Sequence, residues 1–220
     1  MKIAVLINIG KGVGGGTYSI YKFFETLTDF GHEITFFGIN KGNSFLTNPL
    51  PKNIEIKERF RLDNFFGSKR IDNFIDFIYT TTIMEYFFKK NKDFNYICGY
   101  LTKESIKAVN LGKKFDIKTV NFVFESPPWM ENDLGKRWLK EYDKTKKLWK
   151  RTKEAYLKTD ILLSNSKLSK QWCEEWIETK KVTNYIYPGI KLEGIKKIKV
   201  SGKKNQIIYL GRLDERKNIG

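Results

Sequence analysis

Glycines crowd one short segment near the amino terminus, where they would let the backbone approach a charged ligand closely. Residues 10–16 read Gly-Lys-Gly-Val-Gly-Gly-Gly, after an apolar run and before a helix-like stretch. The first six residues match G-x-G-x-x-G in the strand-to-helix setting of a dinucleotide site. Glycine permits close backbone approach, and the amino terminus of a helix attracts phosphate. The segment predicts either a phosphate-binding loop or, more simply, a tight turn from strand to helix.

A nicotinamide-dependent oxidoreductase is the weaker interpretation of this loop. Such enzymes place an acidic residue at the end of the second strand, where it binds the ribose hydroxyls. Residues 38–40 here are Gly-Ile-Asn, so that carboxylate is missing. The chain also contains no G-x-x-x-x-G-K-[ST] segment, which excludes a P-loop kinase or ATPase.

Histidine and cysteine are too scarce for most metal and thiol chemistry. His32 is the single histidine, and Cys98 and Cys173 are the two cysteines. No cluster of these residues with carboxylates has the spacing of a zinc site. We therefore expect no metal site, no disulfide framework and two reduced, inert thiols.

The elements that would position the glycine loop follow a regular alternation of apolar runs and amphipathic segments. We expect strands at residues 2–9, 33–37, 54–57, 95–98, 118–124, 160–163 and 182–187. We expect helices at residues 17–30 (with Thr17 as a cap), 64–90, 103–115, 132–158 and 167–177. This alternation predicts an α/β fold, a Rossmann-like parallel sheet with helices on both faces. Ligands bind beyond the carboxyl ends of the strands in such sheets.

The composition divides the chain into three parts. Residues 1–189 form one α/β domain, and residues 190–205 are rich in Lys and Gly, which is typical of a linker. Residues 206–220 begin a further strand and turn, so we expect them to open a second domain.

Four segments in the same order resemble glycosyltransferase family 4. They are a Gly-Gly pair before the first helix with GHEIT at 31–35, TDILLSNS at 159–166, YIYPGI at 185–190 and IIYLGRLDERKN at 207–218. The family has the GT-B fold, in which two Rossmann-like domains face each other. The resemblance implies a retaining hexosyltransferase that uses a nucleotide sugar and needs neither metal nor cofactor. The chain would be the N-terminal, acceptor-side domain with a truncated start of the donor domain.

Site residues follow from the resemblance, position by position. Arg212 and Lys217 would bind the donor diphosphate, where two cations neutralise the charge that builds on the leaving group. Gly14, Gly15, Gly16 and Thr17 would approach the donor phosphate or the acceptor from the opposite wall.

The sequence departs from the family in two places. The family often has a histidine after the fifth strand, whereas this loop reads Phe-Glu-Ser-Pro-Pro-Trp at 124–129. Glu125 is therefore either a polar contact to the sugar or an ordinary loop carboxylate, and His32 precedes a strand at the opposite end of the sheet. The paired-glutamate donor motif of the family would lie beyond Gly220, so we expect the chain to be inactive alone.

The charge of +16 favours anionic partners. Residues 136–158 contain ten cations and three acids, with aromatic residues between them. This stretch is either a basic helix that lies on an anionic membrane near a glycan or lipid-linked acceptor, or a solvated helix whose aromatic residues are core. A basic nucleic-acid-binding module is also compatible with the charge, but no nucleic-acid-binding motif occurs. We expect a cytoplasmic protein, free or peripheral on the cytoplasmic face of the membrane.

Overall fold

A computed structural model describes residues 1–7, 15–38, 50–57, 82–91, 93–124 and 135–189, without the side chains of residues 135–144. The strands in these ranges form one sheet in the order β3-β2-β1-β4-β5-β6-β7, and every pairing is parallel. The strands are β1 (Lys2–Leu6), β2 (Glu33–Phe37), β3 (Ile54–Lys57), β4 (Tyr96–Tyr100), β5 (Lys118–Val123), β6 (Ile161–Ser164) and β7 (Asn184–Tyr185).

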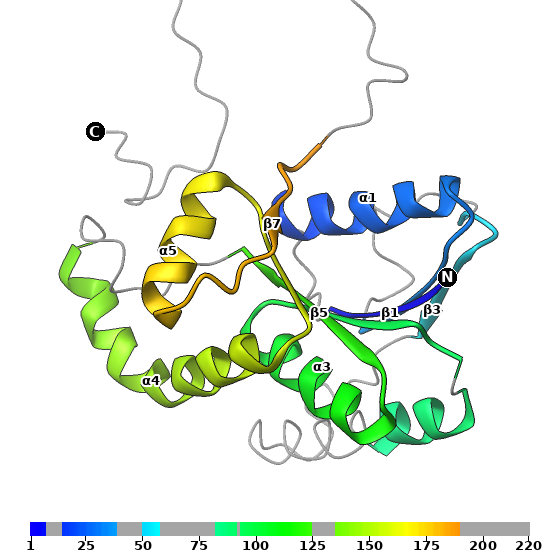
Figure 1. The fold of residues 1–220 in the computed structure, drawn as a ribbon, viewed down its shortest axis with the longest axis horizontal. Coiled ribbons are helices and arrows are strands. Elements are labelled where there is room, and N and C mark those ends of the chain that lie inside the picture. Colours follow the sequence, from blue (N-terminus) through cyan, green and yellow to red (C-terminus); the bar gives the residue numbers. More distant parts are fainter. Residues whose placement is uncertain (8–14, 39–49, 58–81, 92, 125–134, 190–220) are drawn as a thin grey trace, which may run out of the picture.

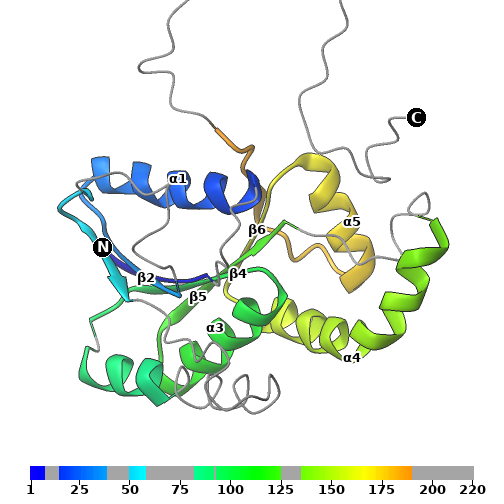
Figure 2. The same cartoon turned by 180° about the vertical axis from the view of Figure 1, so that it is seen from behind.

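Helices cover both faces of this sheet (Figures 1 and 2). One face carries α1 (Gly15–Asp29), and the other carries α3 (Thr102–Phe115), α4 (Gly135–Lys158) and α5 (Lys167–Ile177), with a further helix at residues 82–90. The expected fold class, a Rossmann-like parallel sheet with helices on both faces, is confirmed.

Alternation along the strands divides the core between the two faces. Ile3, Val5 and Ile7 point toward α1, while Ala4 and Leu6 point toward the opposite helices. Such nearly continuous apolar strands are typical of parallel sheets that are covered on both sides.

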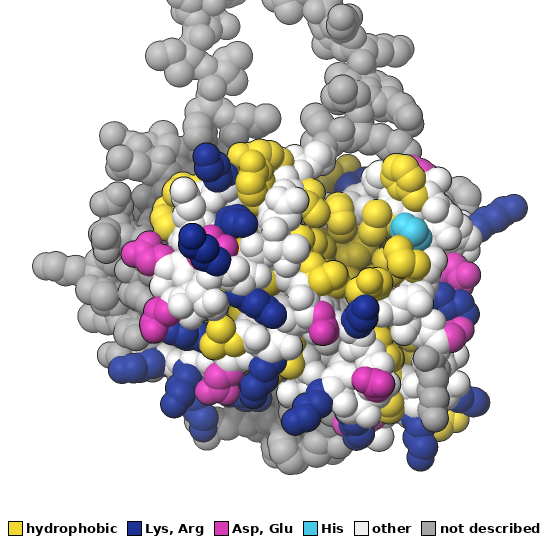
Figure 3. Space-filling view, in the orientation of Figure 1, with side chains coloured by type: hydrophobic (Ala, Val, Ile, Leu, Met, Phe, Trp, Pro, Cys, Tyr) yellow, Lys and Arg dark blue, Asp and Glu magenta, His cyan; other side chains and the backbone are white. Residues whose placement is uncertain are grey.

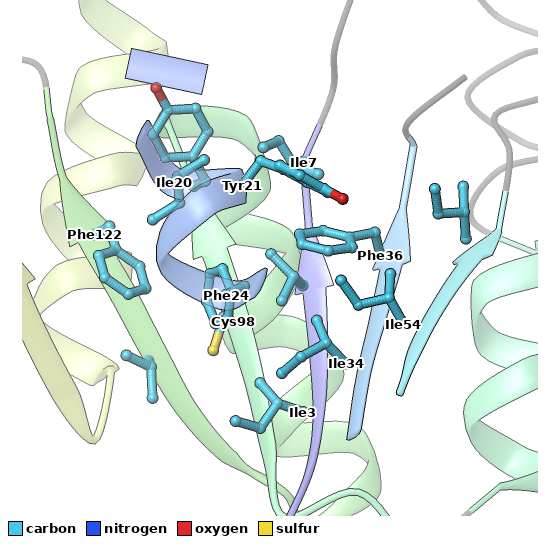
Figure 4. Packing of buried hydrophobic residues seen from close by; sticks show 14 residues of the cluster. Ile3, Ile7, Ile20, Tyr21, Phe24, Ile34, Phe36, Ile54, Cys98 and Phe122 are labelled. Carbon is cyan, nitrogen blue, oxygen red and sulfur yellow. The ribbon is translucent and has the colours of Figure 1, made fainter. Parts of the chain in front are cut away.

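Aromatic rings fill the layer between α1 and the sheet (Figure 4). Tyr21 and Phe24 of α1 are both at most 1% exposed. Their ring centroids lie 5.3 and 6.0 Å from that of Phe36 in β2, and Phe24 also meets Phe122 of β5 at 5.7 Å. The two pairs made by Phe24 are edge-to-face, a geometry that stabilises beyond apolar burial, so α1 is held in a defined position over the sheet.

Several boundaries differ from the sequence-based expectation. The first helix starts at Gly15, so Thr17 lies inside its first turn and is not its cap. The expected strand at 182–187 is paired only at Asn184–Tyr185. β7 is the edge strand, and beyond its two residues a single hydrogen bond on each side, from Thr183 N–H to Leu162 O and from Ile186 N–H to Ser164 O, holds it to β6.

Parts of the expected organisation lie outside the described residues. These are the linker at 190–205, the start of a second domain at 206–220 and the part of the 64–90 helix before residue 82.

The aromatic residues of α4 whose side chains are described belong to the core. Trp149 is 6% exposed and Tyr156 is 2% exposed, and both rings contact Trp176 of α5. For these two residues the core interpretation of the basic stretch is correct. No helix within the described ranges has the length and apolar character needed to cross a bilayer.

Candidate functional site

The order of the strands locates the edge at which a ligand would bind. β1 is paired with β2 on one side and with β4 on the other, so the direction of the chain through the sheet reverses between β1 and β4. The helix after β1 lies on one face and the helix after β4 on the other. Open α/β sheets bind their ligands outside the carboxyl ends of the strands at such a switch point.

Gly16 brings the amino terminus of α1 against the end of β4. A Cβ atom added at Gly16 would lie 2.7 Å from the hydroxyl oxygen of Tyr100. Tyr100 is 4% exposed, and its ring packs edge-on against Phe124 at a centroid distance of 5.0 Å. Only glycine fits there without a shift, so one predicted site residue and one unpredicted tyrosine meet at the switch point.

Gly15 differs from Gly16, although both residues are exposed in the first turn of α1. A Cβ atom added at Gly15 would meet nothing within 4 Å. Within the described structure, packing does not require glycine at this position. Thr17 follows in the same turn and is partly exposed.

The entry to α3 is conformationally strained. Leu101, which joins β4 to this helix, has φ 72° and ψ 173°, a combination that costs a non-glycine residue about 1–3 kcal/mol. The Leu101 side chain provides no capping acceptor for the first turn of α3. Glu104 in that turn is only 7% exposed. Its burial beside the strained backbone of Leu101, at the ligand-binding edge, makes Glu104 a candidate site residue.

Hydrogen bonds fix the ends of β5 and β6 at this edge. The Ser164 hydroxyl donates to Ser166 O at 2.9 Å, and Ser166 caps α5 by accepting from the Ser169 N–H at 3.0 Å. Asn165 N–H donates to Val123 O at 3.3 Å. The segment that resembles the family at 159–166 therefore rigidifies the edge.

The amino-terminal end of the segment 159–166 also has a structural role. Asp160 accepts hydrogen bonds from the backbone N–H and the hydroxyl of Thr119, at 2.7 and 2.9 Å. The backbone hydrogen bond is the main cause that holds the pKa of Asp160 below its ordinary value of 3.8. Asp160 lies at the amino ends of β5 and β6, away from the ligand-binding edge, so we give it no role in chemistry.

Exposed aromatic rings stand where β7 leaves the sheet. Tyr185 and Tyr187 are 36% and 63% exposed, and their rings meet edge-on at 5.3 Å. Tyr18, in the first turn and a half of α1, is also exposed, and the β7 end and the amino terminus of α1 lie side by side (Figures 1 and 2). Large exposed rings of this kind supply apolar contact to a ligand while keeping a polar tip.

Most of the remaining predicted site residues are not described by the structure. Gly14, Glu125, Arg212 and Lys217 lie outside the described residues, although Glu125 directly follows Phe124 at the end of β5. His32 lies at the amino edge, where its Nδ1 is 3.4 Å from the N-terminal amine, so it is remote from the switch point as expected. In the described part of the chain, no group of three or more His, Cys, Asp or Glu residues has a metal-binding arrangement.

Sequence reasoning missed Tyr100 and Glu104. The signal for Tyr100 was its place just beyond the expected strand at 95–98, at the carboxyl end where ligands bind in such sheets. The sequence contains no signal for Glu104. Its burial is seen only in the structure, because glutamate is usually exposed.

Comparison with known proteins gives matches of fold. No protein-family model matches the sequence, and no curated protein matches it. Sucrose-phosphate synthase from Thermosynechococcus elongatus matches with a TM-score of 0.67 at 11% identity, over 87% of this chain and 49% of that protein. Phytolacca americana apo UGT2 matches with a TM-score of 0.60 at 9% identity, over 86% of this chain and 51% of that protein. Anabaena HepE in complex with UDP-glucose matches with a TM-score of 0.59 at 11% identity, over 87% of this chain and 45% of that protein.

The chain spans about half the length of these proteins, and the identities are low enough that the matches show the fold alone. That fold is the α/β, Rossmann-like parallel sheet that GT-B glycosyltransferases share.

Proposed function

We propose that the chain is the acceptor-side half of a glycosyltransferase that moves a sugar from a nucleotide sugar to a glycan or lipid-linked acceptor. The observation that carries the proposal is the match over more than four-fifths of the chain to proteins such as HepE, which was solved with UDP-glucose. Phytolacca americana UGT2, solved with UDP-2fluoro-glucose and pterostilbene, also matches. The four family-like segments of the sequence support the same activity.

Each predicted site residue has a proposed role in the sugar transfer. The oxygen of an acceptor hydroxyl forms a bond to the anomeric carbon while the bond from that carbon to the diphosphate breaks. The nucleoside diphosphate leaves and takes up the hydroxyl proton. Arg212 and Lys217 would neutralise the charge on the leaving diphosphate. Gly15 and Gly16 would let the amino terminus of α1 approach an anionic or hydroxyl group of the substrates. Glu125 would contact the sugar, and the transfer would be a retaining hexosyl transfer that needs no metal.

Tyrosines at the edge fit the acceptor side of this reaction. The Tyr100 hydroxyl lies beside Gly16, and Tyr185 and Tyr187 present exposed rings where β7 ends. Ring faces pack against apolar surface and their hydroxyls hydrogen-bond, which is the combination that a sugar with apolar C–H faces and polar hydroxyls requires.

The nicotinamide alternative fits the structure less well. Gly38 follows β2 at the position where a ribose-binding acid would stand. It has φ 97°, and its N–H donates to Lys57 O at 3.0 Å. The position is a glycine in positive-φ backbone whose N–H pairs with the end of β3, so it provides no carboxylate.

Nuclear magnetic resonance of the isotope-labelled chain tests the proposal. Oligosaccharides and UDP-glucose are titrated separately, with NAD⁺ as the comparison ligand. We expect shifts at Gly15, Gly16, Thr17, Tyr100 and Leu101, with weak binding of UDP-glucose because the chain spans about half the length of the proteins it matches in fold. Saturation by NAD⁺ at lower concentration than by UDP-glucose, or shifts confined to the amino edge, would contradict the proposal.

Two tyrosine variants sharpen the acceptor test. Tyr187→Ala and Tyr86→Ala remove side chains that are both 63% exposed, but Tyr86 lies on the helix at residues 82–90. We expect Tyr187→Ala to weaken oligosaccharide binding at least threefold, an effect of about 0.7 kcal/mol or more. Tyr86→Ala is expected to leave it unchanged. Equal loss of oligosaccharide binding in Tyr187→Ala and Tyr86→Ala would contradict a role of β7 in the acceptor site.

Catalysis by the isolated chain is not expected. Incubation with nucleotide sugars should release no nucleotide above the uncatalysed background, because the chain spans only about half the length of the glycosyltransferases it matches in fold. Measurable sugar transfer or donor hydrolysis by the 220-residue chain would refute this part of the proposal.

We propose a cytoplasmic location, free or peripheral on the cytoplasmic face of the membrane. The support is the surplus of cations in the sequence, since the cytoplasmic leaflet carries anionic lipids.

A further inference from the structure

The solvent side of α4 carries more exposed cations than any other helix face whose side chains are described. Its exposed cations are Lys146, Lys147, Lys150, Arg151 and Lys158, which we call the basic arc. α4 lies at the periphery of the molecule, and cationic side chains stand along this rim in the space-filling view (Figures 1 and 3).

Helical spacing places the members of the basic arc on one side. At about 100° per residue, residues 146, 147, 150, 151 and 158 fall within an arc of about 140°. Trp149, Thr152, Ala155 and Tyr156 occupy the opposite side and are at most 6% exposed. The helix is therefore firmly seated, and the basic arc is its outward surface.

The charge of this surface is almost entirely of one sign. Glu154 is the single exposed acid between residues 145 and 158. Lys153, at the rim of the arc, is partly buried and bound to Glu178 of α5 at 2.8 Å, so it is already neutralised. Five cations against one acid leave a surplus of four positive charges over about four turns of helix.

We propose that the basic arc docks on the surface of an anionic phospholipid bilayer. The docking is peripheral, because Trp149 and Tyr156 pack against Trp176 at 5.5 and 6.0 Å and are not available to insert. Leu157, 43% exposed and within the arc, is positioned to enter the headgroup region. The inference is independent of sugar transfer, since it stands on charge and burial alone.

Two features favour a lipid surface over a nucleic acid. Leu157 places an apolar side chain among the cations, where a bilayer interface gains from it and a phosphate backbone does not. Four of the five cations are lysines, which act as point charges, whereas base recognition in nucleic acids relies mostly on bidentate arginine contacts.

Vesicle co-sedimentation of the full 220-residue chain tests the proposal. Vesicles of phosphatidylcholine with about 30% phosphatidylglycerol are compared with pure phosphatidylcholine. The arc variant Lys147→Gln/Lys150→Gln/Arg151→Gln is compared with Lys52→Gln/Lys89→Gln/Lys90→Gln, which removes three exposed cations from other elements. Circular dichroism and thermal unfolding confirm that both variants fold.

We expect the arc variant to bind anionic vesicles on the order of 100-fold more weakly than the wild type, at about fivefold per cation. The control variant should lose at most severalfold, and binding should disappear in about 1 M salt. Equal loss in both variants, equal binding to neutral vesicles, or no wild-type binding would overturn the proposal. A single-stranded RNA whose binding depends on the arc while vesicle binding does not would assign the surface to nucleic acid instead.

Discussion

Gly16→Ala tests whether the switch point is built as the structure shows. The added Cβ would lie 2.7 Å from the Tyr100 hydroxyl, well inside the 3.4 Å at which ordinary contacts begin. The phenol cannot move away easily, because its ring is 4% exposed and packed against Phe124. Overpacking of this kind costs about 1–3 kcal/mol. The better helix propensity of alanine returns less than about 1 kcal/mol in a first turn. We expect a net loss of about 1–2 kcal/mol.

Urea unfolding followed by circular dichroism measures this loss, with Gly15→Ala as the matched control. Gly15 has nothing within 4 Å of an added Cβ, so alanine there should be neutral or stabilise by up to about 1 kcal/mol. The double variant Gly16→Ala/Tyr100→Phe removes the obstructing oxygen. It should recover most of the Gly16→Ala loss, with a coupling energy of about 1–2 kcal/mol. Equal stability of the two alanine variants, or zero coupling with Tyr100→Phe, would refute the reasoning.

Three further predictions address packing, pH and thiol reactivity. Gly99→Ala should cost about 3 kcal/mol in urea unfolding, more than Gly16→Ala, because its Cβ would meet backbone, 2.6 Å from the Cα of Ser105; a loss no larger than that of Gly16→Ala would contradict this ranking. Asp160→Asn should cost about 1 kcal/mol at pH 7, the value of an exposed charge-assisted hydrogen bond. The folded-state pKa of Asp160 is lowered, so its contribution is present above its ordinary pKa of 3.8 and is lost as pH falls through the folded-state pKa. The stability difference between wild type and variant should therefore shrink as pH falls below 3.8 and close only below the lowered folded-state pKa of Asp160, and a difference that does not shrink below pH 3.8 would count against the Thr119 interaction. Burial raises the pKa of both thiols, that of Cys173 to about 12, so a thiol reagent at pH 8 should label neither Cys98 nor Cys173 until the protein unfolds; rapid labelling of the native protein would show that a thiol is accessible.

The sheet was predictable because its signal is local and repeated. Each described strand overlaps an expected strand. Most expected strands are followed by a helical segment, which favours parallel pairing; the strand at 33–37 is the exception, because no helix was expected between it and the strand at 54–57. The ends of the strands were less predictable. Tyr100 extends β4 beyond the expected Cys98, because pairing to Phe122 of β5 continues that strand and this pairing is a tertiary property.

The aromatic residues of α4 show what helical spacing alone cannot predict. Trp149 and Tyr156 lie seven residues apart and share a helical face, but spacing alone does not say whether that face meets the protein or a membrane. Trp176 on α5 decides the matter, since it fills the space between them. What the sequence did predict was that cations would occupy the remaining face of the helix.

The glycine loop was predicted as a unit, but its described members have different physical roles. Gly16 is required by a neighbour inside the protein, so its substitution changes stability and ligand binding together. Gly15 has open space around its Cα, so alanine there carries no packing cost within the described structure. A loss of ligand binding in Gly15→Ala at unchanged stability would therefore report direct contact between the backbone and the ligand. The interpretation of residues 10–16 as a binding loop is therefore tested at Gly15. Gly16 does not test it, because close packing against Tyr100 explains that glycine without a ligand.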